Sequence, residues 1–550
     1  MNRFAKLALA PAIALALLAA PVAAAFAQTL KPVAVVSIAS VEENLADVGY
    51  ITRIAGQEDV GKTAMLFGNA LTAGIDKKRP IGMYVVPQAG DFHAVAFVPV
   101  SNLKLLLEVH QEQVGEPEDV GGNILKIGTD RTAYVKEVGG WAFVAESKEH
   151  LSNLPQDPAA LLGDLPKSYN VAGRVLMQNI PDELRRLAID EMKLGMERFF
   201  DARPPQPGLD REQTEKLAKS YIDQVEKFLS EADEITFGVG IDAAGKKTFV
   251  DISVAAREGT DLARQMARQD GIKSQFAGFL LPEASVTLNL ASIMGQEEVA
   301  QVREMMKAAR EQSAKHIDDD PNLPAEKREA AKKVVGQLID VAEQTLSAGK
   351  VDGGAALVLL PKSISFVAGG YVADGAAMEK AIKDLVDLGK NEPNFPEVKF
   401  NVGSHGGVAL HSLSHAIPES EAEARELLGE KLQVTIGTGQ TSFFVSVGKD
   451  SEALLKKVID KNAAEADKPV PPMQLNVSLL PILKFYSSVD DNPLVASLVS
   501  SLEQEGNDKL IITSTAGPRS TTTRIEVQEG LVRVIGDAVK MFKEQLNQLQ

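Results

Sequence analysis

Residues 56–63 have the spacing that a nucleotide-binding loop needs. The segment reads GQEDVGKT, from Gly56 to Thr63, and matches the phosphate-loop pattern G-x-x-x-x-G-K-S/T letter for letter. In such a loop a strand leads in, main-chain N–H groups surround the phosphates, and the lysine reaches the terminal phosphates. Here the preceding apolar residues have helical spacing, and Glu58 and Asp59 would place carboxylates where phosphates lie. We interpret the segment as a turn between two helices.

The histidines at positions 405, 411 and 415 form the second candidate site. A metal ion is often held by two imidazoles and a carboxylate. His411 and His415 lie on a strand predicted over Gly407–Ile417, where an even spacing places them on the same face. Residues four apart on a strand are separated by about 13 Å, which is too far for one ion. We expect polar side chains on a solvated face.

Three consecutive aspartates, Asp318 to Asp320, form the third candidate site. A calcium loop of the EF-hand type needs alternating oxygen ligands, a central glycine and a closing glutamate at fixed positions. No glycine stands at the sixth position here. We interpret the aspartates as the solvated turn of a helical hairpin.

The sequence motifs of several known hydrolase families do not occur in the chain. No G-x-S-x-G elbow and no H-E-x-x-H helix occur, and the single tryptophan, Trp141, follows a Gly-Gly turn, as a packing residue would. We therefore assign no catalytic, cofactor-binding or metal-ligating residue and expect no cofactor. A site assembled from dispersed residues stays open, because tertiary contacts bring such residues together.

The first 27 residues predict export. Arg3 and Lys6 form a positive region, Leu7–Val22 an apolar one, and Ala25–Ala27 a cleavage site of small residues before Gln28. These features are typical of a secretory signal peptide cleaved after Ala27. We expect a periplasmic or extracellular protein with no transmembrane segment in the mature chain.

The composition of the 550 residues argues against some kinds of chemistry and some kinds of binding partner. The chain has no cysteine, which excludes disulfides and thiol chemistry. Its net charge of −17 argues against nucleic acid as a partner, because nucleic-acid binding depends on Lys and Arg that neutralise phosphates. The acidity itself is a matter of solubility and indicates no ligand.

The elements needed to position any site occur twice along the chain. A strand and a helical hairpin open at Val33–Ser40 and again at Ala284–Ser292, and hairpins that lead into helices follow in the same order. We predict an α+β fold, with two similar domains from an internal duplication. Each would be an antiparallel sheet with helical hairpins packed on one face. The predicted domains are 28–281 and 282–550, divided near Pro282.

Several individual elements are specific enough to check. We predict helices over Val41–Ala55 and Thr63–Ala73, and a helix after Ser101 with that serine as its N-cap. An amphipathic helix that includes Met192–Phe200 precedes a Pro-rich loop at 203–208.

Short phrases in both halves carry a family resemblance. They include GGWAFV at Gly139–Val144 and LQVTIGTG at Leu432–Gly439. With its signal peptide and hairpin–helix units, the chain resembles a family of uncharacterised exported proteins of planctomycete-type bacteria. The resemblance covers most of the mature chain. It implies export and the fold, and no activity.

Two classes of function follow. We favour a non-enzymatic protein of the cell envelope or exterior that binds a protein or small-molecule partner. The alternative is an extracytoplasmic hydrolase-type enzyme, and a carrier of apolar ligands is a variant of the first class. An enzyme predicts a pocket where His, Asp or Ser side chains converge, and a carrier predicts a large pocket lined by Leu, Met and Phe. A scaffold or adhesive protein predicts an exposed apolar patch.

Overall fold

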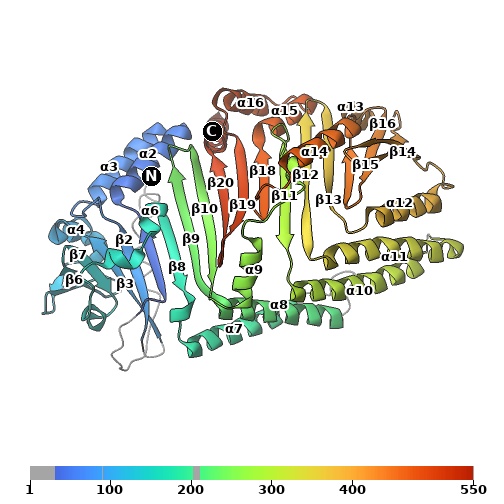
Figure 1. Ribbon diagram of the computed structural model, residues 1–550. Coiled ribbons are helices and arrows are strands. Elements are labelled where there is room, and N and C mark those ends of the chain that lie inside the picture. The colour runs from blue at the N-terminus through green and yellow to red at the C-terminus, as the bar shows by residue number, and fades with distance from the viewer. Residues whose placement is uncertain (1–30, 89–90, 130, 202–210, 322, 549–550) are drawn as a thin grey trace. The chain divides into compact units, whose positions relative to one another are not determined.

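The computed structural model describes residues 31–88, 91–129, 131–201, 211–321 and 323–548 (Figure 1). The predicted signal peptide and the Pro-rich loop at 203–208 lie outside these residues. The chain divides into two compact units. Unit 1 comprises Met1–Leu262 and Glu526–Gln550, and unit 2 comprises Ala263–Ile525. The first boundary between the compact units lies between Leu262 and Ala263. The boundary near Pro282, which is predicted for a sequence repeat, stays a prediction.

Unit 1 contains an antiparallel sheet. Its strands follow the spatial order β4–β5–β6–β7–β3–β2–β1–β8–β9–β10. Their bounds are β1 Ala34–Ile38, β2 Ile81–Gln88, β3 Asp91–Pro99, β4 Glu118–Asp119, β5 Ile124–Ile127, β6 Ala133–Val138, β7 Trp141–Ala145, β8 Val171–Leu176, β9 Ala232–Asp242 and β10 Lys247–Ala256.

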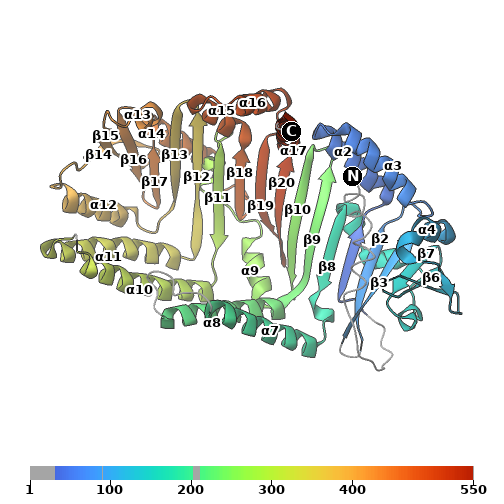
Figure 2. The same cartoon turned by 180° about the vertical axis from the view of Figure 1, so that it is seen from behind.

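The helices of unit 1 occupy the connections between these strands. They are α2 Val41–Ile54, α3 Glu58–Leu71, α4 Leu103–Val109, α5 Gln111–Val114, α6 Leu165–Ser168, α7 Asp182–Asp201, α8 Arg211–Glu231 and, from the end of the chain, α17 Glu529–Gln548. The pair α2–α3 joins β1 to β2, and the pair α7–α8 joins β8 to β9. Because β1 and β8 are antiparallel neighbours, the two pairs leave from opposite ends of the strands. Figures 1 and 2 show α7 and α8 below the ends of β8–β10 in both views.

The strands of unit 2 are antiparallel as well. They follow the order β14–β15–β16–β17–β13–β12–β11–β18–β19, and β20 pairs with β19. Their bounds are β11 Val286–Ile293, β12 Lys350–Leu360, β13 Ser363–Tyr371, β14 Glu397–His405, β15 Val408–Ala416, β16 Lys431–Thr438, β17 Ser442–Val447, β18 Met473–Ser478, β19 Lys509–Ala516 and β20 Ser520–Gln528.

The helices of unit 2 also lie in the connections. They are α10 Gln296–Asp319, α11 Ala325–Ser347, α12 Gly375–Gly389, α13 Ala422–Leu428, α14 Ser451–Glu465, α15 Leu479–Val489 and α16 Pro493–Glu505. Helix α9 (Asp261–Gln269) spans the division between the units. Among the described helices, none combines the length and the apolar character that crossing a membrane requires.

Each unit has its own apolar core on one side of its sheet. In unit 1, Phe97, Trp141 and Phe143 pack with leucines from the segment 151–165. In unit 2, Phe279, Phe444 and Leu455 form the corresponding centre. Burial of these large side chains is the main favourable term in folding each unit.

The structure confirms the α+β class with antiparallel strands and corrects two details. The second helix of the first hairpin begins at Glu58 rather than Thr63, so most of the predicted turn is helical. Asn102, not Ser101, is the N-cap of α4, because its side chain accepts a hydrogen bond from the Leu105 N–H at 3.0 Å. An Asn one position later serves the capping role equally well.

Candidate functional site

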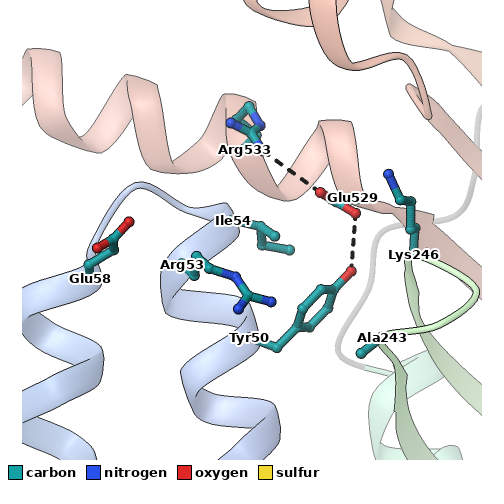
Figure 3. A pocket seen from close by; sticks show the side chains of 8 residues that line it. All are labelled: Tyr50, Arg53, Ile54, Glu58, Ala243, Lys246, Glu529 and Arg533. Carbon is teal, nitrogen blue, oxygen red and sulfur yellow. Dashed lines mark hydrogen bonds and ion pairs between the residues drawn. The ribbon is translucent and has the colours of Figure 1, made fainter.

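A cavity of about 430 Å³ lies in unit 1, where three distant parts of the chain meet (Figure 3). The corner between α2 and α3, the turn between β9 and β10, and the first turns of α17 supply its walls. Its lining residues are Tyr50, Arg53, Ile54, Glu58, Ala243, Lys246, Glu529 and Arg533. Three of the eight are cationic and two are acidic.

The back of the cavity is built on Glu529, the first residue of α17. Its buried carboxylate accepts a hydrogen bond from the Tyr50 hydroxyl at 3.3 Å and lies 3.7 Å from the Arg533 guanidinium. Burial first, and then the neighbouring Glu529 carboxylate, raise the pKa of Tyr50 to about 12. The phenol is therefore a hydrogen-bond donor at every physiological pH.

Two further cations face the same space. The Arg53 guanidinium carbon lies 5.8 Å from the centre of the Tyr50 ring, which places it in cation–π range. Lys246 is held in the left-handed backbone region with φ +56°, and its carbonyl accepts the Glu529 N–H at 2.9 Å. Within the described part of the chain, neither Arg53 nor Lys246 has a carboxylate within ion-pair distance.

The phosphate-loop lookalike is not a phosphate loop. Helix α2, not a strand, leads into it, and the segment from Glu58 onward is the first part of α3. Lys62 pairs with Asp59 at 3.4 Å, and the Thr63 hydroxyl donates to the Asp59 carbonyl. Only Glu58, a carboxylate, lines the cavity.

The three histidines do not come together at one ion. His405 pairs with Asp460 at 2.7 Å, and His415 is exposed. The expectation of a solvated face is wrong for His411, which is only 1% exposed because Phe400 covers it edge-on. Its ring makes hydrogen bonds within unit 2 and none of the histidines lines the cavity.

The remaining sequence candidates have structural roles. Asp318 and Asp319 are the last two residues of α10, Asp320 is its C-cap, and Asp318 pairs with Lys332 at 2.7 Å. The aspartates therefore lie at the end of α10 next to the turn of the hairpin, rather than forming that turn. Trp141 is buried against Phe97, with the Arg79 guanidinium 3.8 Å from its ring centre. Searched over the described residues, the chain has no group of three His, Asp or Glu side chains arranged to hold a metal ion.

A second feature of unit 1 is a broad apolar surface on its sheet, which we call apolar face 1. Its residues are opposite one another across five strands, so their side chains point to one side. It consists of Ala34, Val36, Ile38, Ile81, Met83, Val85, Val171, Gly173, Val175, Ile235, Phe237, Val239, Val250, Ile252 and Val254. None of these residues is polar.

Apolar face 1 is the more exposed side of its sheet. Phe237 is 51% exposed, and Val171 and Ile252 are each 45% exposed. The opposite side packs on the apolar core through Val35, Tyr84 and Val86. It also buries the polar groups of Ser37, Thr236 and Asp251, and the Tyr169 hydroxyl donates to Asp251 at 3.0 Å. Because the solvated side of an antiparallel sheet ordinarily carries polar residues, the composition of apolar face 1 departs from the usual alternation.

The strands of unit 2 also have an apolar side with exposed residues. This apolar side includes the residues opposite one another on β18, β11, β12 and β13: Met473, Leu475, Val477, Val286, Leu288, Leu290, Gly353, Ala355, Leu357, Phe366, Ala368 and Gly370. Leu290 and Phe366 are exposed, whereas Thr287, Asn289 and Asp352 are buried on the other side.

Comparison with known proteins gives no relative from which a role could be read. No protein-family model, no curated protein and no solved structure matches this chain.

Sequence reasoning missed both features for one reason. Tyr50 is one of the apolar positions with helical spacing before Gly56, and no motif includes Lys246, Glu529 or Arg533. Residues 50, 246 and 529 meet only after folding. The alternation of β9, with Ile235, Phe237 and Val239 on one side, was visible in the sequence. Alternation shows that a strand has two unlike sides, but not which of them the rest of the chain buries.

Proposed function

We propose that this chain is an exported, non-enzymatic interaction protein that docks a protein partner on apolar face 1. The observation that carries the proposal is the wholly apolar composition of apolar face 1, together with the exposure of Phe237, Val171 and Ile252 on it. Contact with water costs about 25 cal/mol for each Å² of apolar surface, so a contiguous apolar surface of this kind favours a covering partner.

The composition of apolar face 1 specifies the partner's chemistry. Its fifteen residues include no charge and no side-chain hydrogen-bond donor or acceptor. A charged or polar group buried against them would lose water without gaining a partner, so the contacting surface must itself be apolar. Five strands about 4.8 Å apart span roughly 19 Å, which is wide enough for a helix or a small sheet.

The two alternative classes of function have less support. A carrier predicts a large pocket lined by Leu, Met and Phe, but the cavity in unit 1 has a mainly charged lining. An enzyme predicts converging His, Asp or Ser side chains, and the cavity has none of these. The exposed apolar patch expected of an interaction protein is the feature that the chain presents.

We also infer that the two units arose by duplication. The shared order of the central strands supports this, since β7–β3–β2–β1–β8–β9 in unit 1 corresponds to β17–β13–β12–β11–β18–β19 in unit 2. The helical pairs α2–α3 and α10–α11 follow the first strand of each set. If the apolar side of the sheet serves in docking, both copies would be expected to retain it, as these two units do.

Native mass spectrometry of residues 28–550 from the host's envelope fraction tests the docking role. The informative variant combines Phe237→Ser with Ile252→Thr, two exposed positions where loss of apolar area leaves the core intact. Leu66→Ser is the matched control, because Leu66 is 70% exposed on α3, outside apolar face 1. We expect a bound protein partner that the double variant holds about tenfold or more weakly and the control holds normally.

Other outcomes would overturn the proposal. A bound lipid or other apolar small molecule that the double variant loses would make the chain a carrier. A bare monomer from the native fraction, or a partner retained equally by both variants, would remove apolar face 1 as the docking surface.

A further inference from the structure

We propose that the cavity between α2, α17 and the β9–β10 turn is a binding site for a small oxyanion, a carboxylate or a phosphate group. This site is distinct from apolar face 1, and neither proposal depends on the other. Its residues come from unit 1 alone, and none of them belongs to the apolar cluster around Phe97, Trp141 and Phe143.

The charges of the lining leave an excess of positive charge facing the cavity. Glu529 is engaged by Tyr50 and by Arg533, so this buried carboxylate balances the arginine of its own helix. Arg53 and Lys246 then remain as cations, and among the described residues no acidic group lies within ion-pair distance of either. In Figure 3 the Arg53 guanidinium is directed toward Tyr50, away from the Glu58 carboxylate. The chain as a whole has a net charge of −17, so the local excess of positive charge at the cavity is opposite in sign to that of the molecule.

The side chains that line the cavity have the chemical groups that bind an oxyanion. A guanidinium offers planar paired donors that match carboxylate and phosphate oxygens, and an ammonium adds a compact charge. The Tyr50 phenol stays protonated and neutral behind them, so it adds no competing negative charge. Ile54 and Ala243 leave room for a small apolar body attached to the anionic group.

The backbone at Lys246, in the turn between β9 and β10, adopts the left-handed conformation. A non-glycine residue with φ +56° carries a conformational cost that Gly or Asn would largely avoid. Two hydrogen bonds hold the turn: Gly245 N–H donates to Asp242 at 2.7 Å, and Glu529 N–H donates to the Lys246 carbonyl. The left-handed backbone therefore occurs at a cationic residue that lines the cavity.

Isothermal titration calorimetry of residues 28–550 with inorganic phosphate and, separately, with acetate tests the site. The variants are Arg53→Gln and Lys246→Asn, since Asn tolerates the left-handed region and preserves the turn. Lys62→Gln is the control, because that lysine is exposed and already paired with Asp59 outside the cavity. Circular dichroism melting of each variant checks that the fold is kept.

We expect wild type and Lys62→Gln to bind one of the probes, and each cavity variant to bind it about tenfold more weakly. Binding of phosphate alone assigns a phosphate ligand, and binding of acetate assigns a carboxylate. Failure of wild type to bind either probe overturns the site. Equal weakening by Lys62→Gln also overturns it, because the effect would then come from general charge. The Phe237→Ser, Ile252→Thr variant should bind the probe like wild type, which separates this test from that of docking.

Discussion

At the scale of single residues, His411 lies in a chain of hydrogen bonds inside unit 2. Its Nδ1 accepts the Asn401 N–H at 3.1 Å, so its Nε2–H donates to the Thr438 hydroxyl at 2.9 Å. Thr438 in turn donates to Glu379 at 3.1 Å, and Lys383 pairs with the same carboxylate. In this series of hydrogen bonds, every polar group has a partner only if the imidazole of His411 is neutral.

This network predicts a pH dependence of stability. Burial lowers the pKa of His411, and Lys383 acts in the same direction, while Glu379 opposes them. The contribution of neutral His411 to the free energy of unfolding is therefore fully present above the ordinary histidine pKa, near 6.5. It is lost as the pH falls below that value, because the unfolded chain then takes up a proton more readily than the folded chain. We expect wild type to lose up to about 1.4 kcal/mol per pH unit from this group.

Chemical unfolding of unit 2 at pH 7.5 and 5.5 measures the effect. His411→Gln should lower stability at pH 7.5 but show a smaller loss on acidification. His415→Gln should keep the wild-type slope, because that residue is exposed. Equal slopes for wild type and His411→Gln would contradict the prediction.

At the scale of elements, the contact between α17 and the end of α2 depends on Gly536. A Cβ placed there would lie 2.2 Å from the Ala55 carbonyl oxygen and 2.7 Å from two other backbone atoms of Ala55. Backbone cannot yield as a flexible side chain can, so any side chain at 536 forces the helices apart. Glu529 and Arg533 lie on the same stripe of α17, at helical spacing from Gly536.

Gly536→Ala should therefore destabilise unit 1, although alanine ordinarily stabilises a helix by about 1 kcal/mol relative to glycine. The matched control is Gly195→Ala in α7, where a Cβ meets nothing within 4 Å and the ordinary gain is expected. Hydrogen exchange should report faster exchange in α17 for Gly536→Ala only. Stabilisation by both substitutions would show that the close contact does not limit α17 packing.

At the scale of the whole molecule, the predicted signal peptide at residues 1–27 leads to a prediction about export. We expect the mature protein isolated from its host to begin at Gln28. Replacing Ala27 with Arg should block processing, because the cleavage site requires small residues. Intact mass spectrometry distinguishes a chain of 550 residues from one of 523, the number left after removal of 27. A mature chain that keeps residues 1–27 in wild type would contradict export by this signal.

Local patterns in the sequence predict the individual strands and helices. The alternation at Ile81–Val86 and the helical spacing at Val41–Ala55 specify their own structure, because each depends on residues a few positions apart. The same local logic identified the entry to Gly56–Thr63 as helical and excluded a phosphate loop.

Tertiary structure alone decided which side of each sheet is buried and where a cavity lies. Phe237 and Thr236 are neighbours on β9, yet the first is half-exposed and the second is buried. That outcome depends on the segment 148–168, which covers one side of the sheet and leaves the other open. Tyr50 and Glu529, 479 positions apart, meet only because α17 returns to unit 1. Contacts over such separations arise from packing of the whole chain, which no local pattern encodes.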